Sequence, residues 1–256
     1  RRSSPPLGDP LDTYTLLAIC ALLGLGALLY TSVGHAGASA YIAIMALFSL
    51  APATIRPAAL VLNIMVASFT SWRFIRAGQF DGRRLLPFLI GSLPLAFIGG
   101  RITLPGATYR PLIGIVLLIA GVRLLWPRPM KRQDEITTPP PAAGVASGAA
   151  IGLLSGLTGT GGGIFLSPLL IMAGWSSARM ASGIAAVFIL ANSIAGLAGN
   201  LSSVGHLPPE LPWFMVSVAI GAVIGTSLGV TRLPAHRLLQ ALGVVLLVAA
   251  GKLILT

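Results

Sequence analysis

Residues 152–174 read GLLSGLTGTGGGIFLSPLLIMAG, an apolar run that a glycine cluster from Gly159 to Gly163 divides in two. The part that follows, Gly163–Gly174, has 12 residues and is too short to cross a bilayer as a helix. Near the N-terminus, Gly34-His35-Ala36-Gly37 precedes a second short run, Ala38–Leu50, of 13 residues. Each place predicts a helix that breaks at membrane depth and continues as a half-helix.

The composition of the 256-residue chain is that of an integral membrane protein. Hydrophobic residues make up 55% and charged residues 9%, whereas soluble domains carry about a quarter charged residues. The mean hydropathy of +0.90 agrees. A net charge of +11 would suggest a nucleic-acid partner in a soluble protein, but in a membrane protein it indicates cytoplasmic loops and anionic lipid or substrate. We therefore expect no nucleic-acid partner, and the lone Cys20 allows no internal disulfide.

About ten apolar runs predict an all-α, polytopic membrane fold. Six of them approach or meet the ~20 residues that a spanning helix needs: Tyr14–Val33, Leu85–Leu104, Thr108–Trp126, Ser177–Gly199, Leu211–Thr231 and Ala235–Leu255. A seventh, Thr54–Trp72, is slightly shorter, and an eighth, Ala142–Leu157, is short and rich in small residues. The two short runs after the glycine breaks complete the set. In each half the order is the same: a long helix, a break, a short helix and three further helices.

A polar, proline-rich stretch separates the halves. It predicts four regions: an N-terminal tail 1–13, a membrane repeat 14–126, a cytoplasmic linker 127–141 and a membrane repeat 142–256. A shift of 125 residues superimposes the two glycine breaks, and a shift of 129 places Asn63 on Asn192, which indicates an internal repeat. Because the shifts differ by 4, we expect the loop after the short helix to differ in length by four residues.

The Lys and Arg content of short loops predicts the orientation. Cytoplasmic loops are expected around the linker and around Arg73, Arg76, Arg83 and Arg84, whereas 200–212 has no Lys or Arg and is expected outside. Equivalent loops of the two halves then lie on opposite sides, which is the inverted repeat of many secondary transporters. Both termini are expected outside. Alternatively, the first run is a signal peptide with Ala38-Ser39-Ala40 at its cleavage site, although Leu16–Val33 is long for one.

Paired breaks in inverted halves are the feature that best marks a transporter's binding site. A helix that starts inside the bilayer presents unpaired N–H groups and the positive end of its dipole, and glycine lets an anion approach the backbone. No Asp or Glu lies within the apolar runs, which disfavours a site for metal cations or amines. We therefore expect an anion site, without metal or cofactor, formed by Gly34, His35, Gly37, Ala38, Ser39, Asn63, Gly159, Thr160, Gly161, Gly162, Gly163 and Asn192.

Several polar residues have structural alternatives. Arg56 and Arg179 are expected to attract the anion, or else to reach out to lipid headgroups. Asn63 and Asn192 could instead hydrogen-bond between helices. His35 could donate to the anion, couple transport to a proton, or bond the exposed backbone of the break.

Other functions fit the residues less well. The glycine cluster has neither the Lys of a phosphate-binding loop nor the acidic residue of a dinucleotide site. An intramembrane serine protease would need Ser155 as nucleophile and His35 as base, but residues 152–156 lack the tight glycine spacing around a catalytic serine. We therefore expect a transporter rather than an enzyme. A passive anion channel with the same site is the remaining alternative.

The stretch Gly152–Leu170, with its glycine cluster followed by Pro168, resembles the signature of the sulfite exporter TauE/SafE family. Residues 34–39, followed by Arg56-Pro57, resemble a divergent copy of the same repeat, in which Ala43 takes the place of Pro168. The likeness extends over about residues 16–255.

This resemblance implies a permease of the bacterial inner (plasma) membrane that exports sulfite or an organosulfonate by alternating access, with thiosulfate-like anions also in range. The partners are then a small sulfur anion and the lipid bilayer. The sequence leaves a homo-oligomer open.

Overall fold

The computed structural model describes residues 12–32, 34–125, 136–230, 244, 246–248 and 250–254. These residues form helices and no strand, which confirms the all-α fold: α1 (Thr13–Thr31), α2 (Ala38–Leu47), α3 (Pro52–Arg76), α4 (Gly82–Arg101), α5 (Gly106–Leu125), α6 (Pro141–Thr158), α7 (Gly163–Met172), α8 (Ala178–Gly199), the 3-10 helix η2 (Leu201–His206) and α9 (Leu211–Val230). The described residues of the last expected run are also helical. The rest of that run, most of the expected tail and most of the linker lie outside the described residues.

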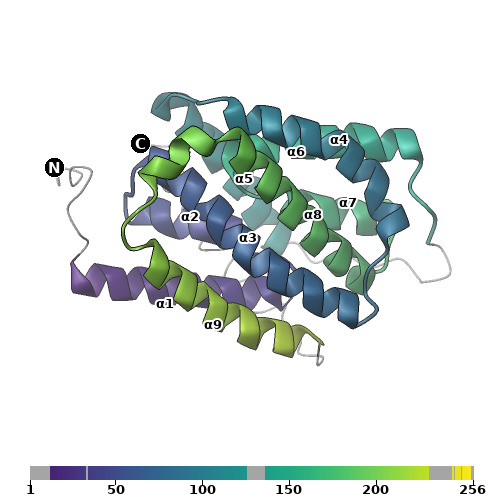
Figure 1. The fold of residues 1–256 in the computed structure, drawn as a ribbon, viewed down its shortest axis with the longest axis horizontal. Helices are drawn as coiled ribbons and strands as arrows, with labels where there is room; N and C mark the ends of the chain where they lie inside the picture. Colours follow the sequence, from purple (N-terminus) through teal and green to yellow (C-terminus); the bar gives the residue numbers. More distant parts are fainter. Residues whose placement is uncertain are drawn as a thin grey trace.

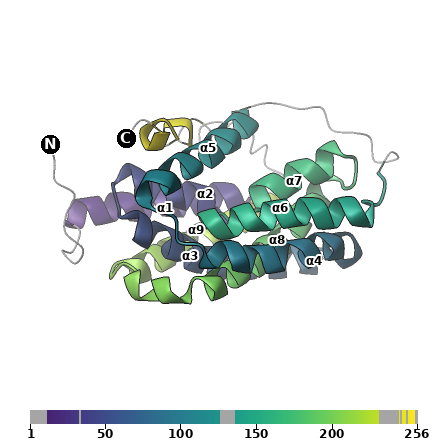
Figure 2. The same ribbon diagram turned by 90° about the horizontal axis from the view of Figure 1, so that it is seen from above.

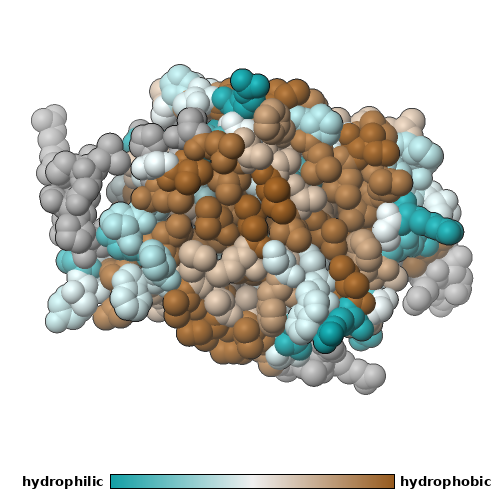
Figure 3. Space-filling model, in the orientation of Figure 1, coloured by the Kyte–Doolittle hydropathy of each residue, from teal (hydrophilic) through white to brown (hydrophobic). Residues whose placement is uncertain are grey.

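The described helices have the length and surface of a membrane protein. Five of them are long and apolar enough to span a bilayer: Thr13–Thr31, Ala53–Arg76, Pro141–Thr158, Arg179–Gly199 and Leu211–Leu228. α2, α7 and Gly106–Val122 of α5 are shorter apolar helices. Hydrophobic residues cover most of the face drawn in Figure 3, and the most hydrophilic residues lie around its edge. The expected multi-pass membrane protein is confirmed.

The two halves exchange helices. α1 packs along α9 of the second half, α6 packs along α4 of the first half, and α3 contacts α8 (Figures 1 and 2). α1 and α6 are the first helices of their halves, and α4 and α9 are the α-helices that follow α3 and α8. The first helix of each half therefore packs along the corresponding later helix of the other half, and the two exchanged pairs are reciprocal. A two-fold relation between the halves would give this packing. The opposite orientation of the halves in the membrane stays a prediction.

One expected detail of the repeat is wrong. Residues 48–51 connect α2 to α3 and residues 173–177 connect α7 to α8, so these loops differ by one residue and not by four. The larger difference arises later, where 77–81 connect α3 to α4 but 200–210, including η2, connect α8 to α9. Consequently Asn63 is the twelfth residue of α3 and Asn192 the fifteenth of α8, and they do not hold equivalent places in their helices.

Glycines bring the backbones of α4 and α6 into contact. Four of them recur at every fourth residue of α6: Gly144, Gly148, Gly152 and Gly156. A Cβ atom at Gly148 would lie 2.2 Å from the carbonyl oxygen of Phe88, and one at Gly156 would lie 2.2 Å from that of Ala96. Small residues at this spacing are the usual means of close helix packing in membranes.

We expect Gly148→Val to destabilise the folded protein by about 2 kcal/mol or more, because the new side chain would have to push α4 away. The melting temperature in detergent and the monodisperse yield measure this effect. Gly106→Val is the matched control, since a Cβ atom at Gly106 would meet nothing within 4 Å. Equal melting temperatures of the two variants would contradict the backbone contact.

Candidate functional site

The first predicted break joins α1 to α2. α1 ends at Thr31, and the N–H of His35 donates to the carbonyl of Tyr30 at 2.9 Å. Gly34 and Gly37 have φ angles of +80° and +102°, a region that glycine adopts far more readily than other residues. Gly37 is the N-cap of α2 and supplies no side-chain hydrogen bond. The first N–H groups of α2 are therefore left for another acceptor.

The second break has the same construction. α6 ends before Gly159, which has a φ angle of +83°, and α7 begins after Gly162, which has a φ angle of +78° and again no side-chain cap. α2 and α7 each have 10 residues. Both helices are thus interrupted at the predicted glycine clusters, and each continues as a short helix with an uncapped start.

The two breaks meet. Nε2 of His35 lies 3.1 Å from the carbonyl oxygen of Gly163, the first residue of α7. From this place α2 and α7 run in opposite directions (Figure 2). The described residues of both breaks are buried, apart from His35, which is half-buried. Two positive helix ends therefore approach one another inside the protein.

Each break packs against the third helix of the other half. A Cβ atom at Gly34 would lie 2.4 Å from Cβ of Ser182 in α8, and one at Gly159 would lie 3.2 Å from Cγ of Arg56 in α3. Ser182 and Arg56 are each the fifth residue of their helix. The breaks thus hold equivalent places in the two halves, although the residues that face them differ.

Buried polar groups cluster beside the second break. A Cβ atom at Gly161 would lie 2.6 Å from Nδ2 of Asn63 and 3.1 Å from Oγ of Ser193, and this Nδ2 donates to that Oγ at 3.3 Å. A Cβ atom at Gly162 would lie 3.5 Å from Cβ of Ser155. Oδ1 of Asn63 and Oγ of Ser155 have no hydrogen-bond partner, although both residues are 0% exposed. Unpartnered buried polar atoms are costly, and a ligand that binds here would compensate them.

Further neutral polar groups lie in the second break and in the helix ends that flank both breaks, and Asn192 lies in α8. The hydroxyls of Tyr30 and Ser39 are 2.7 Å apart, and those of Thr158 and Thr160 are 2.9 Å apart. Nδ2 of Asn192 donates to the backbone of its own helix at 2.9 Å, and its Oδ1 has no partner. All five residues are buried. Ser39, Thr160 and Asn192 were predicted from the sequence as site residues, but nothing in the spacing marked Tyr30 or Thr158.

The two arginines that were expected to attract an anion have different surroundings. Arg56 is 6% exposed and donates to the carbonyl oxygens of Gly99 at 2.7 Å, Gly100 at 2.7 Å and Ile102 at 2.9 Å. It is therefore a buried cap on the negative end of α4 and does not reach toward headgroups. Arg179 is exposed in the first turn of α8, outside the buried group.

Neither a protease dyad nor a metal centre is formed by the described residues. Oγ of Ser155 has no hydrogen-bond partner, so it does not pair with His35. No group of three or more His, Cys, Asp or Glu among the described residues could hold a metal ion. The chemistry that this site offers is hydrogen bonding from backbone N–H, hydroxyl and amide groups.

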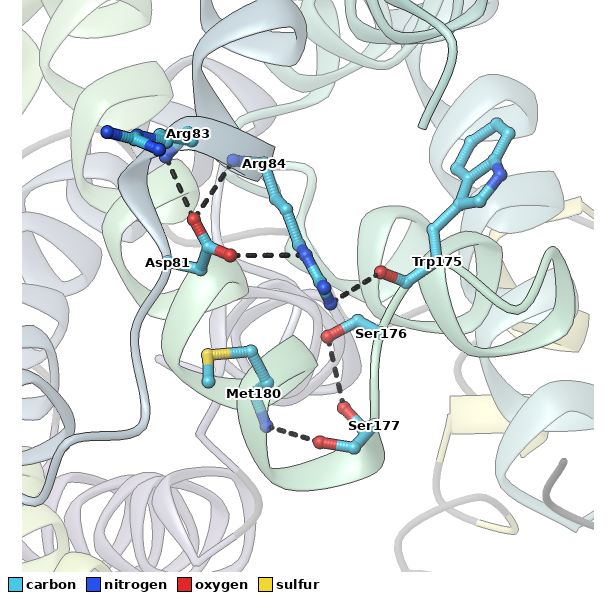
Figure 4. A network of polar contacts seen from close by, with 7 residues as sticks. All are labelled: Asp81, Arg83, Arg84, Trp175, Ser176, Ser177 and Met180. Atoms are coloured by element: carbon cyan, nitrogen blue, oxygen red, sulfur yellow. Dashed lines mark hydrogen bonds and ion pairs between the residues drawn. The ribbon is translucent and has the colours of Figure 1, made fainter. Parts of the chain in front are cut away.

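The far end of α7 is tied to the first half of the chain. Nη1 of Arg84, in the first turn of α4, donates to the carbonyl of Trp175, just after α7, at 3.0 Å (Figure 4). Nε of Arg84 lies 3.1 Å from Oδ2 of Asp81. Oδ1 of Asp81 accepts the N–H groups of Arg83 at 3.0 Å and Arg84 at 3.2 Å, and so caps α4. Asp81 therefore orients the arginine that holds the end of α7.

The far end of α2 has an analogous tie to the second half. Nζ of Lys252, in the C-terminal helical residues 250–254, donates to the carbonyl oxygens of Ala46 at 3.1 Å and Leu47 at 2.7 Å. It also contacts Oγ of Ser49 at 3.0 Å. Each half-helix thus has its negative end against a basic side chain from the opposite half.

Comparisons with known proteins extend over both breaks. Residues 17–253 match the family described as "Sulfite exporter TauE/SafE". A protein of Sinorhizobium fredii that is named a probable membrane transporter is 40% identical over 231 residues, which is 89% of this chain and 94% of that protein. No solved structure matches the chain. The similarity covers both halves together and is not confined to one of them.

Proposed function

This chain belongs to the sulfite exporter TauE/SafE family of membrane transporters, and we propose that it exports a small sulfur-containing anion, sulfite or an organosulfonate, across the bacterial inner membrane. The observation that carries the proposal is the meeting of two uncapped helix starts inside the protein, where His35 of one break contacts Gly163 of the other. Helix starts of this kind bind anions through N–H groups and a positive dipole end.

In this proposal the anion is held by neutral donors. The N–H groups at the starts of α2 and α7 surround it, and the hydroxyl of Ser155 and the amide of Asn63 complete its hydrogen bonds. An amide presents either its NH₂ group or its carbonyl oxygen after a half turn, so the orientation of Asn63 can adapt. Arg56 adds positive charge nearby while α4 occupies its donors. Neutral donors also permit release, because a direct guanidinium contact would hold an oxyanion more tightly.

Alternating access would use the two ties at the far ends of the half-helices. With the expected orientation, Arg84 closes the cytoplasmic end, where α4 begins and α7 ends. Lys252 closes the outer end, where α2 ends. We propose that one tie opens while the other stays closed, so that the bound anion faces one side at a time.

The ties predict opposite effects of two substitutions. We expect Arg84→Gln to favour the cytoplasm-open state and Lys252→Gln the outside-open state, each by roughly tenfold, because each removes charge-assisted hydrogen bonds from one end only. A cysteine introduced by Ser155→Cys in a Cys20→Ser background reports access of an impermeant thiol reagent from each side. Arg83→Gln is the control, since only the backbone N–H of Arg83 contacts Asp81. Increased labelling from the same side in both variants would contradict the two-gate mechanism.

A flux assay in proteoliposomes tests the function itself. We expect efflux of sulfite or a small organosulfonate to exceed efflux of sulfate and chloride. Efflux of thiosulfate measures how broad the specificity of the site is. A secondary transporter should respond to a coupling gradient such as pH, whereas a passive channel would follow voltage alone. Chloride flux equal to sulfite flux, with no dependence on any ion gradient, would favour the channel.

A further inference from the structure

An apolar cleft of about 170 Å³ lies between α3 and α9, away from the breaks. Its lining consists only of Met65, Val66, Phe69, Ala219, Ala222 and Val223. Val66 and Ala222 are buried and form the floor, whereas Val223 is 50% exposed. The cleft is therefore open to the lipid-facing side of the helix pair, and the side chains that line it are all apolar.

The cleft makes the pair α3 and α9 different from the pair of helices that corresponds to it in the exchanged arrangement. That corresponding pair is α4 and α8, whose backbones are in close contact at glycines. A Cβ atom at Gly100 would lie 2.3 Å from the carbonyl oxygen of Gly196, and one at Gly199 would lie 2.1 Å from that of Phe97. Larger side chains hold α3 and α9 apart. An apolar group that lies in the cleft would gain dispersion contacts with its lining.

Cationic groups lie one helical turn beyond the cleft. Arg73 follows Phe69 by four residues, stacks over its ring with Cζ 5.8 Å from the centroid, and donates to Oγ of Ser227 in α9 at 3.1 Å. Arg76 stacks over Trp72, with Cζ 4.6 Å from that centroid. Among the described residues, the sole Arg–carboxylate ion pair is Arg84 with Asp81, so no described carboxylate pairs with Arg73 or Arg76.

We propose that this cleft binds one acyl chain of an anionic phospholipid whose phosphate lies on Arg73 and Arg76. The order along the helices is that of a lipid: an apolar cleft at depth, then two guanidinium groups and the half-exposed ring of Trp72 where α3 ends. Aromatic and basic side chains are typical of the headgroup level. The proposal is independent of the transported anion, because the cleft shares no residue with the breaks.

The test is lipid retention by the purified full-length protein. Delipidated protein is mixed with stoichiometric dioleoyl phosphatidylglycerol or dioleoyl phosphatidylcholine, and bound lipid is counted by native mass spectrometry. We expect one phosphatidylglycerol to be retained at least about fivefold better than phosphatidylcholine, because basic residues at a membrane surface attract anionic lipid. Arg73→Gln should lower this retention, whereas Arg83→Gln, which changes a basic residue at the start of α4, away from the cleft lining, should not.

Filling the cleft separates a built site from general attraction to charge. Ala219→Phe and Val223→Phe should each lower phosphatidylglycerol retention about as much as Arg73→Gln, and two independent positions guard against misfolding of one variant. Size-exclusion chromatography checks that each variant is monodisperse. Equal retention of both lipids, equal losses in Arg73→Gln and Arg83→Gln, or unchanged retention in both Phe variants would overturn the proposal. A cleft filled by a second copy of the chain would appear as a dimer that the Phe variants dissociate, which would also overturn it.

Discussion

Gly161→Ala is expected to reduce anion flux about 100-fold, which corresponds to about 3 kcal/mol. Gly161 has a φ angle of +75°, and the added methyl group would lie 2.6 Å from Nδ2 of Asn63 and 2.8 Å from Cγ2 of Ile189. The substitution therefore puts carbon where the anion is proposed to approach the backbone, and it strains the turn that starts α7. Sulfite efflux from proteoliposomes, normalised to the amount of reconstituted protein, measures the effect.

Gly78→Ala is the matched control for that experiment. Gly78 also has a positive φ angle, +68°, but a Cβ atom there would meet nothing within 4 Å. Both variants therefore carry a comparable backbone cost, and only one of them fills the site. Wild-type efflux in Gly161→Ala, or an equal loss in both variants, would show that the second break does not bind the anion.

Arg56→Leu is expected to lower the stability of the protein by about 3 kcal/mol, because it leaves the buried carbonyls at the end of α4 without donors. The melting temperature in detergent should fall by roughly 10 °C. Arg56→Lys should recover part of the loss, since one ammonium group cannot satisfy three carbonyl oxygens as a planar guanidinium does.

Arg179→Leu should change the melting temperature little, because Arg179 is exposed. If Arg179 attracts the anion from solution, as the sequence suggested, the flux of Arg179→Leu should be lower than that of the wild type at low ionic strength. The two fluxes should become equal at high salt, where the charge of Arg179 is screened in the wild type. Equal stability of the Arg56 and Arg179 variants would contradict the role of Arg56 as a buried cap.

The breaks could be predicted from the sequence because their signal is local. A glycine cluster inside an apolar run, followed by a run too short to span, leaves few structures open to the chain. The repeated glycine positions likewise indicated an internal repeat, but they did not predict that each half packs its first helix against the other half. The recurrence of glycine at every fourth residue of α6 is an equally local signal, and it is typical of a close contact with another helix.

The partners of individual polar side chains could not be predicted, because they depend on how distant helices rotate against each other. Arg56 donates hydrogen bonds to the end of α4, more than forty residues further along the chain. Asn63 donates to Ser193, which lies 130 residues further along. The equivalence of Asn63 and Asn192 failed because a constant shift ignores where the inserted residues lie. Matching helix starts instead relates Arg56 to Ser182, which the sequence comparison did not bring together.

The exchange of helices between the halves has a consequence for how the protein is made. Of the described helices α1 is synthesised before the others, but its main partner α9 follows almost two hundred residues later, so α1 must stay in the bilayer with its packing surface facing lipid. α6 meets the opposite situation, because α4 is already in place when it emerges. The mean hydropathy of these two helices agrees with their different situations, since it is the highest of the five candidate spans for α1, 1.9, and the lowest for α6, 1.3. A nascent chain released before α9 would therefore retain α1 in the membrane yet leave it without its main packing partner.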